Sequence, residues 1–312
     1  MEAMKKNSWL STYLYSSDSQ DDFLQTEVSE FLKKINDWPW IKQYFFVRYW
    51  ENGLHIRLRF NGDSHRLEMT LKPYIQNYFE YNQSKETAPS ENIRRNIIRF
   101  VEYVPETDRY GGKDAVKVCE RQFHLSSRVV LRIMVSSNPW SYEMALSSAI
   151  HLHVLFVRAV GLNVAQSKKF FELVLKKWFS RSMAIVIEEN RSGTAFRAFE
   201  EVYRFHKDSL MKRVLSIWYA NSDDLESVIK EWYIENVNLI ARLQPMICIS
   251  TVEKRDVSNL GDKCWNVYES LVHMTNNRLG ILNRDESYLG FVLMKCFSEL
   301  DEMELHIDKN RG

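Results

Sequence analysis

The chain has 312 residues, of which 45% are hydrophobic and 27% are charged, and its 42 Lys and Arg nearly balance 41 Asp and Glu. This composition is typical of a folded globular protein, and the near-neutral charge argues against a broad basic surface for nucleic acid. The chain has no run of about eighteen apolar residues and no secretory apolar core at its start, so we predict a cytoplasmic protein without a membrane span.

The first third of the chain mixes predicted strands and helices. In chain order, the predicted elements are a strand over 8–15, a helix over 21–35, a hairpin of strands over 43–50 and 54–60, a helix over 64–82, a polar loop over 84–92 and a strand over 95–106. The hairpin is predicted because Asn52-Gly53 suits a tight turn with positive φ. Pro73 predicts a kink or break in its helix, and Pro105 stops the last strand.

Beyond residue 112 the apolar spacing is helical. The predicted helices span 113–135, 140–160, 165–190, 194–220, 223–245, 260–279 and 285–306. The predicted fold class is α+β, with an antiparallel sheet and hairpin in the N-terminal part packed against a large, mostly helical C-terminal part. We expect a single domain over 1–312, strand-rich over 1–112 and helical over 113–312.

One face of the second hairpin strand is strongly basic. Alternate residues of a strand share a side. One row therefore holds His55, Arg57 and Arg59, and the opposite row holds Leu54, Ile56, Leu58 and Phe60. On this pattern alone the basic row is either a solvated sheet face or a cationic wall of a pocket for an anion.

The segment YVPETDRYGG, residues 103–112, holds Glu106 and Arg109 just before a Gly-Gly pair. Gly111 and Gly112 permit backbone conformations closed to other residues and allow a ligand to come close. The alternative interpretation is an ordinary strand-to-helix turn.

A third segment, SLVHMTNNRLGI over 270–281, holds His273 and Arg278 near the end of a predicted helix, where Gly280 is a plausible stop. A lone helical His is also common as a packed or solvated residue, so this segment alone does not establish a site.

Together, FFVRYWENGLHIRLRF, YVPETDRYGG and HMTNNRLG resemble the glutamate-elimination domain of class I lanthipeptide dehydratases, also known as the thiopeptide-type bacteriocin biosynthesis domain. In that family, an upstream domain esterifies Ser or Thr of a precursor peptide with glutamate from glutamyl-tRNA. The elimination domain then expels glutamate and leaves dehydroalanine or dehydrobutyrine. The chain is similar to a stand-alone elimination module, because it has no extra length for a glutamylation part.

The resemblance also implies a site. Its catalytic residues are Arg59, Glu106, Arg109 and His273, and its substrate-binding residues are His55, Arg57 and Arg278. All four catalytic positions hold the residue type that the family uses. We expect the three segments to surround one cavity.

These residue types suit a β-elimination of glutamate. Guanidinium groups bind carboxylates through paired hydrogen bonds, so Arg59 and Arg109 can hold the glutamyl adduct and stabilise the departing carboxylate. Glu106 can aim a guanidinium or bind the glutamate ammonium group. An imidazole titrates near neutrality, so His273 can take the α-proton or protonate the leaving glutamate. The scheme requires neither a metal nor an organic cofactor.

The expected partners are the glutamylated precursor peptide, a separate tRNA-dependent glutamylation protein and a cyclase, with no direct contact to nucleic acid. Two alternative functions stay open. One is a thiopeptide pyridine synthase, which performs a formal [4+2] cycloaddition of dehydroalanines and releases the leader peptide; the resemblance implies that this branch tends to lose the Arg, Glu, Arg and His set. The other is a non-catalytic scaffold of the same pathway.

Other polar residues carry weaker patterns. His151 and His153 are two apart, so on a helix their rings diverge and cannot share a metal. Ser147 and Ser148 have no triad signature. The cysteines Cys119, Cys248, Cys264 and Cys296 form no CxxC pair, which predicts four reduced thiols and neither a zinc site nor a disulfide framework.

Overall fold

The computed structural model describes residues 7–83, 97–137, 139–183, 190–248 and 263–309. The chain forms two compact units. Unit 1 comprises Met1–Glu106 with Glu120–Trp140, and unit 2 comprises Thr107–Cys119 with Ser141–Gly312. The predicted division after residue 112 lies close to this boundary, although residues 120–140 belong to unit 1. A single domain over the whole chain stays a prediction.

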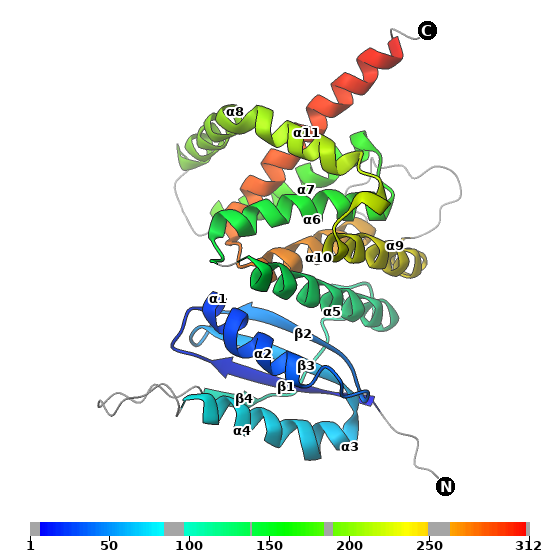
Figure 1. Ribbon diagram of the computed structural model, residues 1–312. Coiled ribbons are helices and arrows are strands. Elements are labelled where there is room, and N and C mark those ends of the chain that lie inside the picture. The colour runs from blue at the N-terminus through cyan, green and yellow to red at the C-terminus, as the bar shows by residue number, and fades with distance from the viewer. Residues whose placement is uncertain (1–6, 84–96, 138, 184–189, 249–262, 310–312) are drawn as a thin grey trace. The chain divides into compact units, whose positions relative to one another are not determined.

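Unit 1 contains the predicted antiparallel sheet (Figure 1). Its elements are β1 (Asn7–Tyr15), α1 (Gln20–Phe23), the π-helical η1 (Leu24–Val28), α2 (Ser29–Lys34), β2 (Ile41–Tyr49), β3 (His55–Asp63), α3 (Ser64–Arg66), the π-helical η2 (Leu67–Leu71), α4 (Lys72–Gln83), β4 (Ile97–Phe100) and most of α5 (Lys113–Ser136). The strand order is β2-β3-β1-β4. The α+β fold class is confirmed.

The hairpin between β2 and β3 forms as predicted. Asn52 has φ 59° and Gly53 has φ 100°, the left-handed conformations that a tight Asn-Gly turn requires. β1 pairs antiparallel with all nine residues of β3, and this register sets Ser11 opposite Arg59 and Tyr13 opposite Arg57. The turn and the register therefore fix which side chains flank the basic row.

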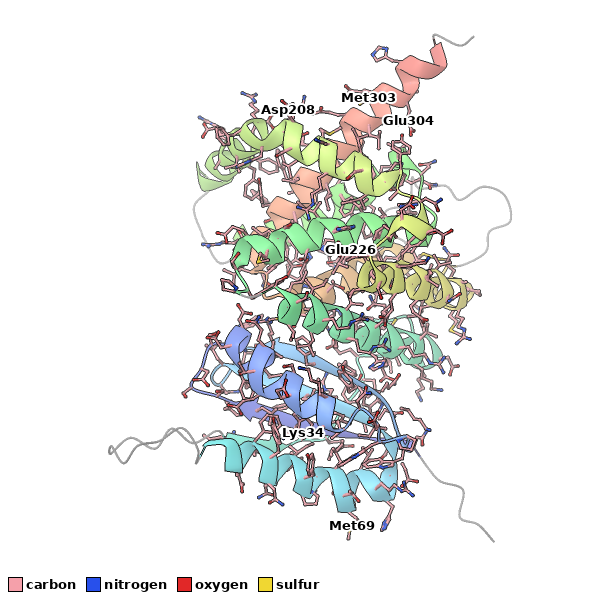
Figure 2. All side chains as sticks on the ribbon, viewed as in Figure 1. Lys34, Met69, Asp208, Glu226, Met303 and Glu304 are labelled. Atoms are coloured by element: carbon pink, nitrogen blue, oxygen red, sulfur yellow. A yellow bond between two sulfur atoms is a disulfide. The ribbon has the colours of Figure 1, made fainter. Side chains whose placement is uncertain are left out.

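The apolar row of β3 lies in the core of unit 1. Ile56, Leu58 and Phe60 have no exposed surface. The ring of Phe31 in α2 contacts Phe60 edge-on at 6.1 Å and Phe79 of α4 at 5.2 Å between centroids. At the end of α2, the ammonium of Lys34 lies 5.0 Å from the Tyr78 ring centroid, and Figure 2 labels this lysine. Leu54, the fourth residue predicted for this row, precedes β3 and is 59% exposed, so that part of the prediction was wrong. Burial of the other three leaves His55, Arg57 and Arg59 on the opposite face.

Two details of unit 1 differ from the prediction. The strand predicted over 95–106 ends at Phe100, because β4 pairs only with Thr12–Tyr15 of β1 and the chain leaves β1 after one further hydrogen bond, from Val101 N to the Ser11 carbonyl at 3.1 Å. Val104 is 74% exposed there, so the alternating pattern did not reflect burial. The helix over 64–82 forms with a π-helical segment just before Pro73, and the loop over 84–92 lies outside the described residues.

Unit 2 is helical (Figure 1). Besides the start of α5 it holds α6 (Tyr142–Val160), α7 (Val164–Met183), α8 (Asn190–Trp218), the 3-10 helix η3 (Ser222–Asp224), α9 (Ser227–Ile247), α10 (Lys263–Leu279) and α11 (Asn283–Lys309). Within the described residues, each helix predicted beyond residue 112 forms, with small shifts at its ends. Residues 184–189 and 260–262 of the predicted helices lie outside the described residues. α11 packs along α7, and α6 packs against α8, α9, α10 and α11.

Helix α6 is the most apolar helix of unit 2. Among the described residues it is the one helix whose length and composition would allow it to cross a membrane, and 56% of its apolar window is buried. Core helices of folded proteins meet the same criteria. Its many helix neighbours in unit 2 account for its composition, and the cytoplasmic location stays a prediction.

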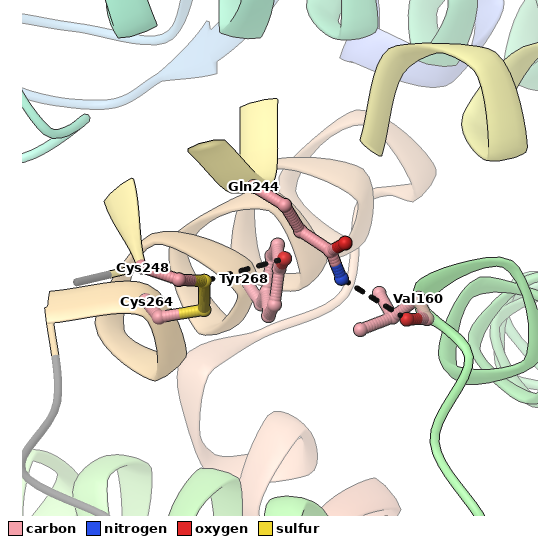
Figure 3. Close-up of a disulfide and its surroundings, with 5 residues drawn as sticks. All are labelled: Val160, Gln244, Cys248, Cys264 and Tyr268. Atoms are coloured by element: carbon pink, nitrogen blue, oxygen red, sulfur yellow. Dashed lines mark hydrogen bonds between the residues drawn. A yellow bond between two sulfur atoms is a disulfide. The ribbon is translucent and has the colours of Figure 1, made fainter. Parts of the chain in front are cut away.

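The prediction of four reduced thiols is wrong for one pair. Cys248 at the end of α9 and Cys264 at the start of α10 form a disulfide, with a Cα–Cα distance of 5.0 Å (Figure 3). Helix packing brings these residues together, which their sequence separation of 16 does not reveal. Cys119 and Cys296 are buried free thiols, as predicted.

Candidate active site

The basic row of β3 lies against aromatic rings in unit 1. The guanidinium carbon of Arg57 lies 3.2 Å from the ring centroid of Tyr49 and 4.5 Å from that of Tyr13. Its Nε donates a hydrogen bond to Nε2 of His55 at 3.2 Å. Cation–π contacts and this hydrogen bond fix the guanidinium in place without neutralising its charge.

His55 orients Arg57 as a neutral imidazole. Because Nε2 accepts from Arg57, the ring proton lies on Nδ1, which donates to the carbonyl of Gly53 at 2.8 Å. Burial lowers the pKa of His55, and the charges of Arg57 and Arg99 lower it further. His55 is only 2% exposed, so the structure supports a positioning role, and its predicted contact with substrate stays a prediction.

Arg59 is a partly buried cation with aromatic neighbours. Its guanidinium carbon lies 4.6 Å from the Tyr103 ring centroid and 5.3 Å from that of Phe45. Its Nε is buried and has no hydrogen-bond partner in the described part of the chain. Burial lowers the pKa of Arg59, and the nearby Glu106 partly opposes this, so the two residues of unit 1 interact electrostatically.

A second arginine of the same sheet has a different environment. Arg48 is buried on the other face, and its Nη1 contacts Asp21 Oδ1 at 2.6 Å in an ion pair. Arg59 is only partly buried and makes no such close ion pair with a described carboxylate, although Glu106 acts on it electrostatically. A guanidinium without a close ion-pair partner can bind an anion.

In unit 2, the second segment contacts the third. Arg109 donates from Nε to Oγ of Ser270 in α10 at 3.2 Å, and Ser270 precedes His273 by one helical turn. Gly111 has φ +88° and Gly112 has φ +113°, as predicted. A Cβ at Gly111 would lie 2.5 Å from Cγ2 of Ile247, so this position also requires a close backbone approach.

His273 is held from two sides. Its Nδ1 lies 2.9 Å from Oε1 and 3.1 Å from Oε2 of Glu286 in α11. The indole of Trp178 in α7 stacks on the imidazole, with 4.2 Å between centroids and 20° between the planes. The ring therefore has a defined plane and a defined rotation.

Both of these neighbours are supported by further hydrogen bonds. Asn276 donates from Nδ2 to Oε2 of Glu286 at 3.0 Å, and His153 Nε2 lies 2.7 Å from Oδ1 of Asn276. Trp178 donates from Nε1 to Glu269 at 2.6 Å, and Glu269 also pairs with Lys177. We refer to His153, Asn276, Glu286 and His273 as the buried imidazole–carboxylate network.

Arg278 faces its own helix. Its side chain has no exposed surface, and Nη1 donates to the carbonyl of Met274 at 2.8 Å. These contacts support a structural role, and its predicted substrate contact stays a prediction. Within unit 2 the structure brings Arg109 and His273 to one face of α10, while convergence of all three segments on one cavity stays a prediction.

Glu286 and Trp178 were not predicted as site residues. Glu286 contacts His273 because α10 and α11 are joined by the short turn at Gly280, which has φ +83°. No spacing rule pairs residues across such a turn. Asn276 carried a usable signal, because it lies three residues after His273 on the same helix face.

The remaining candidates are structural. His153 belongs to the buried network, and burial lowers its pKa to about 4. The described residues include no cluster of three or more metal-ligating side chains. A hollow of about 310 Å³ in unit 1 is lined by parts of β1, α3 and η2, by Lys72 and by residues 100–102, and none of the predicted site residues lines it.

The amino-acid pattern of residues 9–297 matches the family described as lantibiotic biosynthesis dehydratase, C-terminal. The chain belongs to this family. Membership in this family supports a role in lantibiotic biosynthesis. Among curated proteins, the subtilin biosynthesis protein SpaB of Bacillus subtilis is 30% identical over 128 residues, which are 41% of this chain and 12% of SpaB.

Two solved structures share the fold. The pyridine synthase TbtD from thiomuracin biosynthesis superposes with a TM-score of 0.67 at 14% identity, over 95% of this chain and 99% of TbtD. The tRNA-dependent lantibiotic dehydratase MibB from Microbispora sp. 107891 superposes with a TM-score of 0.57 at 18% identity, over 97% of this chain and 29% of MibB. The chain thus spans under a third of MibB and a smaller part of SpaB, and at these identities the structures show the fold alone.

Proposed function

We propose that this protein is a carbon–oxygen lyase that eliminates glutamate from glutamylated Ser or Thr of a ribosomally made precursor peptide. The products are dehydroalanine or dehydrobutyrine and free glutamate. The catalytic residues of the proposal are Arg59, Glu106, Arg109 and His273.

The observation that carries this proposal is the state of Arg59. Its guanidinium is partly buried, lies against aromatic rings and makes no close ion pair with a described carboxylate, so it can pair with an anion. Glutamate leaves as a carboxylate, so stabilising it in the transition state lowers the barrier to elimination. Arg48, neutralised by Asp21, shows that the same sheet pairs an arginine when its role is structural.

Proton transfer is assigned to His273. The elimination breaks the bond from the α-carbon to hydrogen and the bond from the β-carbon to the glutamyl oxygen, and the electron pair from the first bond forms the new double bond. An imidazole within reach can accept the α-proton or protonate the departing carboxylate. Arg109, which donates to Ser270 one turn before His273, supplies a second guanidinium on the same helix face.

The test is incubation of the purified protein with a chemically prepared glutamyl-seryl peptide, followed by mass spectrometry and assay of released glutamate. We expect Arg59→Ala, Arg109→Ala and His273→Ala to fold and to lose elimination by roughly 10²–10⁴-fold, so that glutamylated peptide accumulates. Matched controls are the exposed His65→Ala and Arg66→Ala, which should keep full activity. Full dehydration by all three site variants would refute the assignment.

A second candidate function is a pyridine synthase acting on dehydroalanines. The likeness to TbtD over 95% of this chain favours it as an alternative. A peptide with two dehydroalanines separates the two functions. Ring formation with leader release, together with no glutamate released from the glutamyl peptide, would favour the synthase.

We also propose that the glutamylated precursor is handed over by a separate glutamylation protein. The motivation is that the matched family model describes the C-terminal part of a lantibiotic biosynthesis dehydratase. Adding the glutamylation partner should raise the elimination rate on full-length precursor. Equal rates with and without it would count against the handover.

A further inference from the structure

The described geometry of His273 specifies which ring nitrogen carries its proton. A carboxylate only accepts hydrogen bonds, and both oxygens of Glu286 lie within 3.1 Å of Nδ1. Nδ1 must therefore be protonated and donate. The other nitrogen, Nε2, is then the atom that can accept a proton.

The carboxylate of Glu286 is held in turn by a second side chain. Oε2 of Glu286 also accepts from Nδ2 of Asn276. This orients the Asn276 amide, so its Oδ1 accepts from Nε2 of His153, whose lowered pKa keeps that ring neutral. The chain of bonds thus has one consistent direction, with His153 donating to Asn276, and Asn276 and His273 both donating to Glu286.

Burial strengthens the coupling within the network. The Glu286 side chain is 1% exposed, and Trp178 covers one face of the His273 ring. Burial raises the pKa of the Glu286 carboxyl, and the hydrogen bonds from His273 and Asn276 oppose that rise. In a site of low dielectric constant, a carboxylate beside an imidazole stabilises the imidazolium more than it would in water.

We propose that Glu286 is a positioning residue, which holds His273 with Nδ1 protonated so that Nε2 exchanges the proton with the substrate. This inference rests on the proposed proton transfer by His273. If His273 takes the α-proton, that proton arrives at Nε2 and Glu286 stabilises the resulting imidazolium. If His273 protonates the leaving carboxylate, the proton departs from the same atom.

The kinetic test compares three variants with the glutamyl-seryl peptide as substrate. Glu286→Gln keeps the shape but removes the charge, and we expect kcat to fall by about 10²-fold or more with KM nearly unchanged, as for other orienting carboxylates. Glu286→Asp keeps the charge and should lose less. Glu302→Gln, an exposed glutamate of the same helix, should behave as the wild type. A rise in KM with unchanged kcat in Glu286→Gln would overturn the proposal.

A second readout does not depend on the reaction. Histidine labelled with ¹⁵N reports by NMR which ring nitrogen is protonated, and the His273 signals are assigned by their loss in His273→Ala. We expect Nδ1–H in the wild type and a shift toward Nε2–H in Glu286→Gln. A wild-type ring protonated at Nε2 overturns the proposal without any variant. If the wild type releases no glutamate, the proposed function fails, and the NMR result still decides whether Glu286 fixes the ring.

Discussion

The predicted site residues of the two units have different partners. In unit 1, Arg57 and Arg59 lie against aromatic rings, and no described carboxylate pairs with Arg59. In unit 2, His273 hydrogen-bonds to Glu286, which Asn276 supports in turn. In the proposed reaction, the first arrangement would retain a positive charge for a ligand, and the second would orient a group that moves a proton. Binding an anion and transferring a proton make different demands, and the proposal assigns each to a separate unit.

The largest expected effects come from exchanging two arginines of the sheet, Arg59 and Arg48, for methionine. Arg59→Met should lower the elimination rate by about 10²–10³-fold while the free energy of unfolding stays nearly level, because no close ion pair in the described part of the chain is lost. Arg48→Met should leave elimination nearly unchanged and lower the free energy of unfolding by roughly 1–3 kcal/mol, because Asp21 loses its partner.

Urea unfolding and glutamate release, measured on both variants, check this pair. The same loss of stability in Arg59→Met as in Arg48→Met would show that Arg59 is an ordinary structural cation. The contrast between the units would then disappear.

A smaller effect is expected at the glycine pair that precedes α5. Gly111→Ala combines a strained left-handed backbone with a clash against Ile247, and should lower the free energy of unfolding by roughly 2–4 kcal/mol. Gly112→Ala meets no atom within 4 Å, so backbone strain alone should cost roughly 1–2 kcal/mol.

Urea unfolding measures both glycine variants. If the clash is the cause, Ile247→Ala should restore part of the stability of Gly111→Ala. Equal losses at the two positions would mean that close packing at Gly111 contributes nothing.

The smallest effect is a pH dependence set by the buried network. The pKa of His153 is lowered from 6.5 to about 4, so its stabilisation is present above pH 6.5 and is lost as the pH falls toward 4. Its contribution should change by at most about 1.4 kcal/mol per pH unit in that window. The raised pKa of Glu286 acts in the opposite direction, since that contribution is lost as the pH rises.

Comparing the pH dependence of the unfolding free energy between the wild type and His153→Gln gives the contribution of His153. Unfolding free energies at several pH values between 4 and 7 should show a shallower slope in the variant. Parallel curves would indicate that His153 is protonated equally in the folded and unfolded states.

Much of the fold was predictable because periodicity is a local property. The hairpin formed around Asn52-Gly53, and within the described residues each helix predicted beyond residue 112 formed. The strand predicted over 95–106 forms at Ile97–Phe100, and its extension over 101–106 was wrong, because pairing between β4 and β1 ends at Phe100. The disulfide between Cys248 and Cys264 was missed because α9 and α10 bring the two residues together through packing.

Local pattern determined the element order, the turn conformations and the row of His55, Arg57 and Arg59 on one strand face, since these depend on residues close in the chain. The motif resemblance also selected His273. Only the tertiary structure decided that Arg59 lacks a described carboxylate, that Arg48 has one, and that Glu286 holds His273. Those facts depend on contacts between elements that are distant in the sequence. The free energy of placing a charge in the folded protein depends on its burial and on the groups packed next to it.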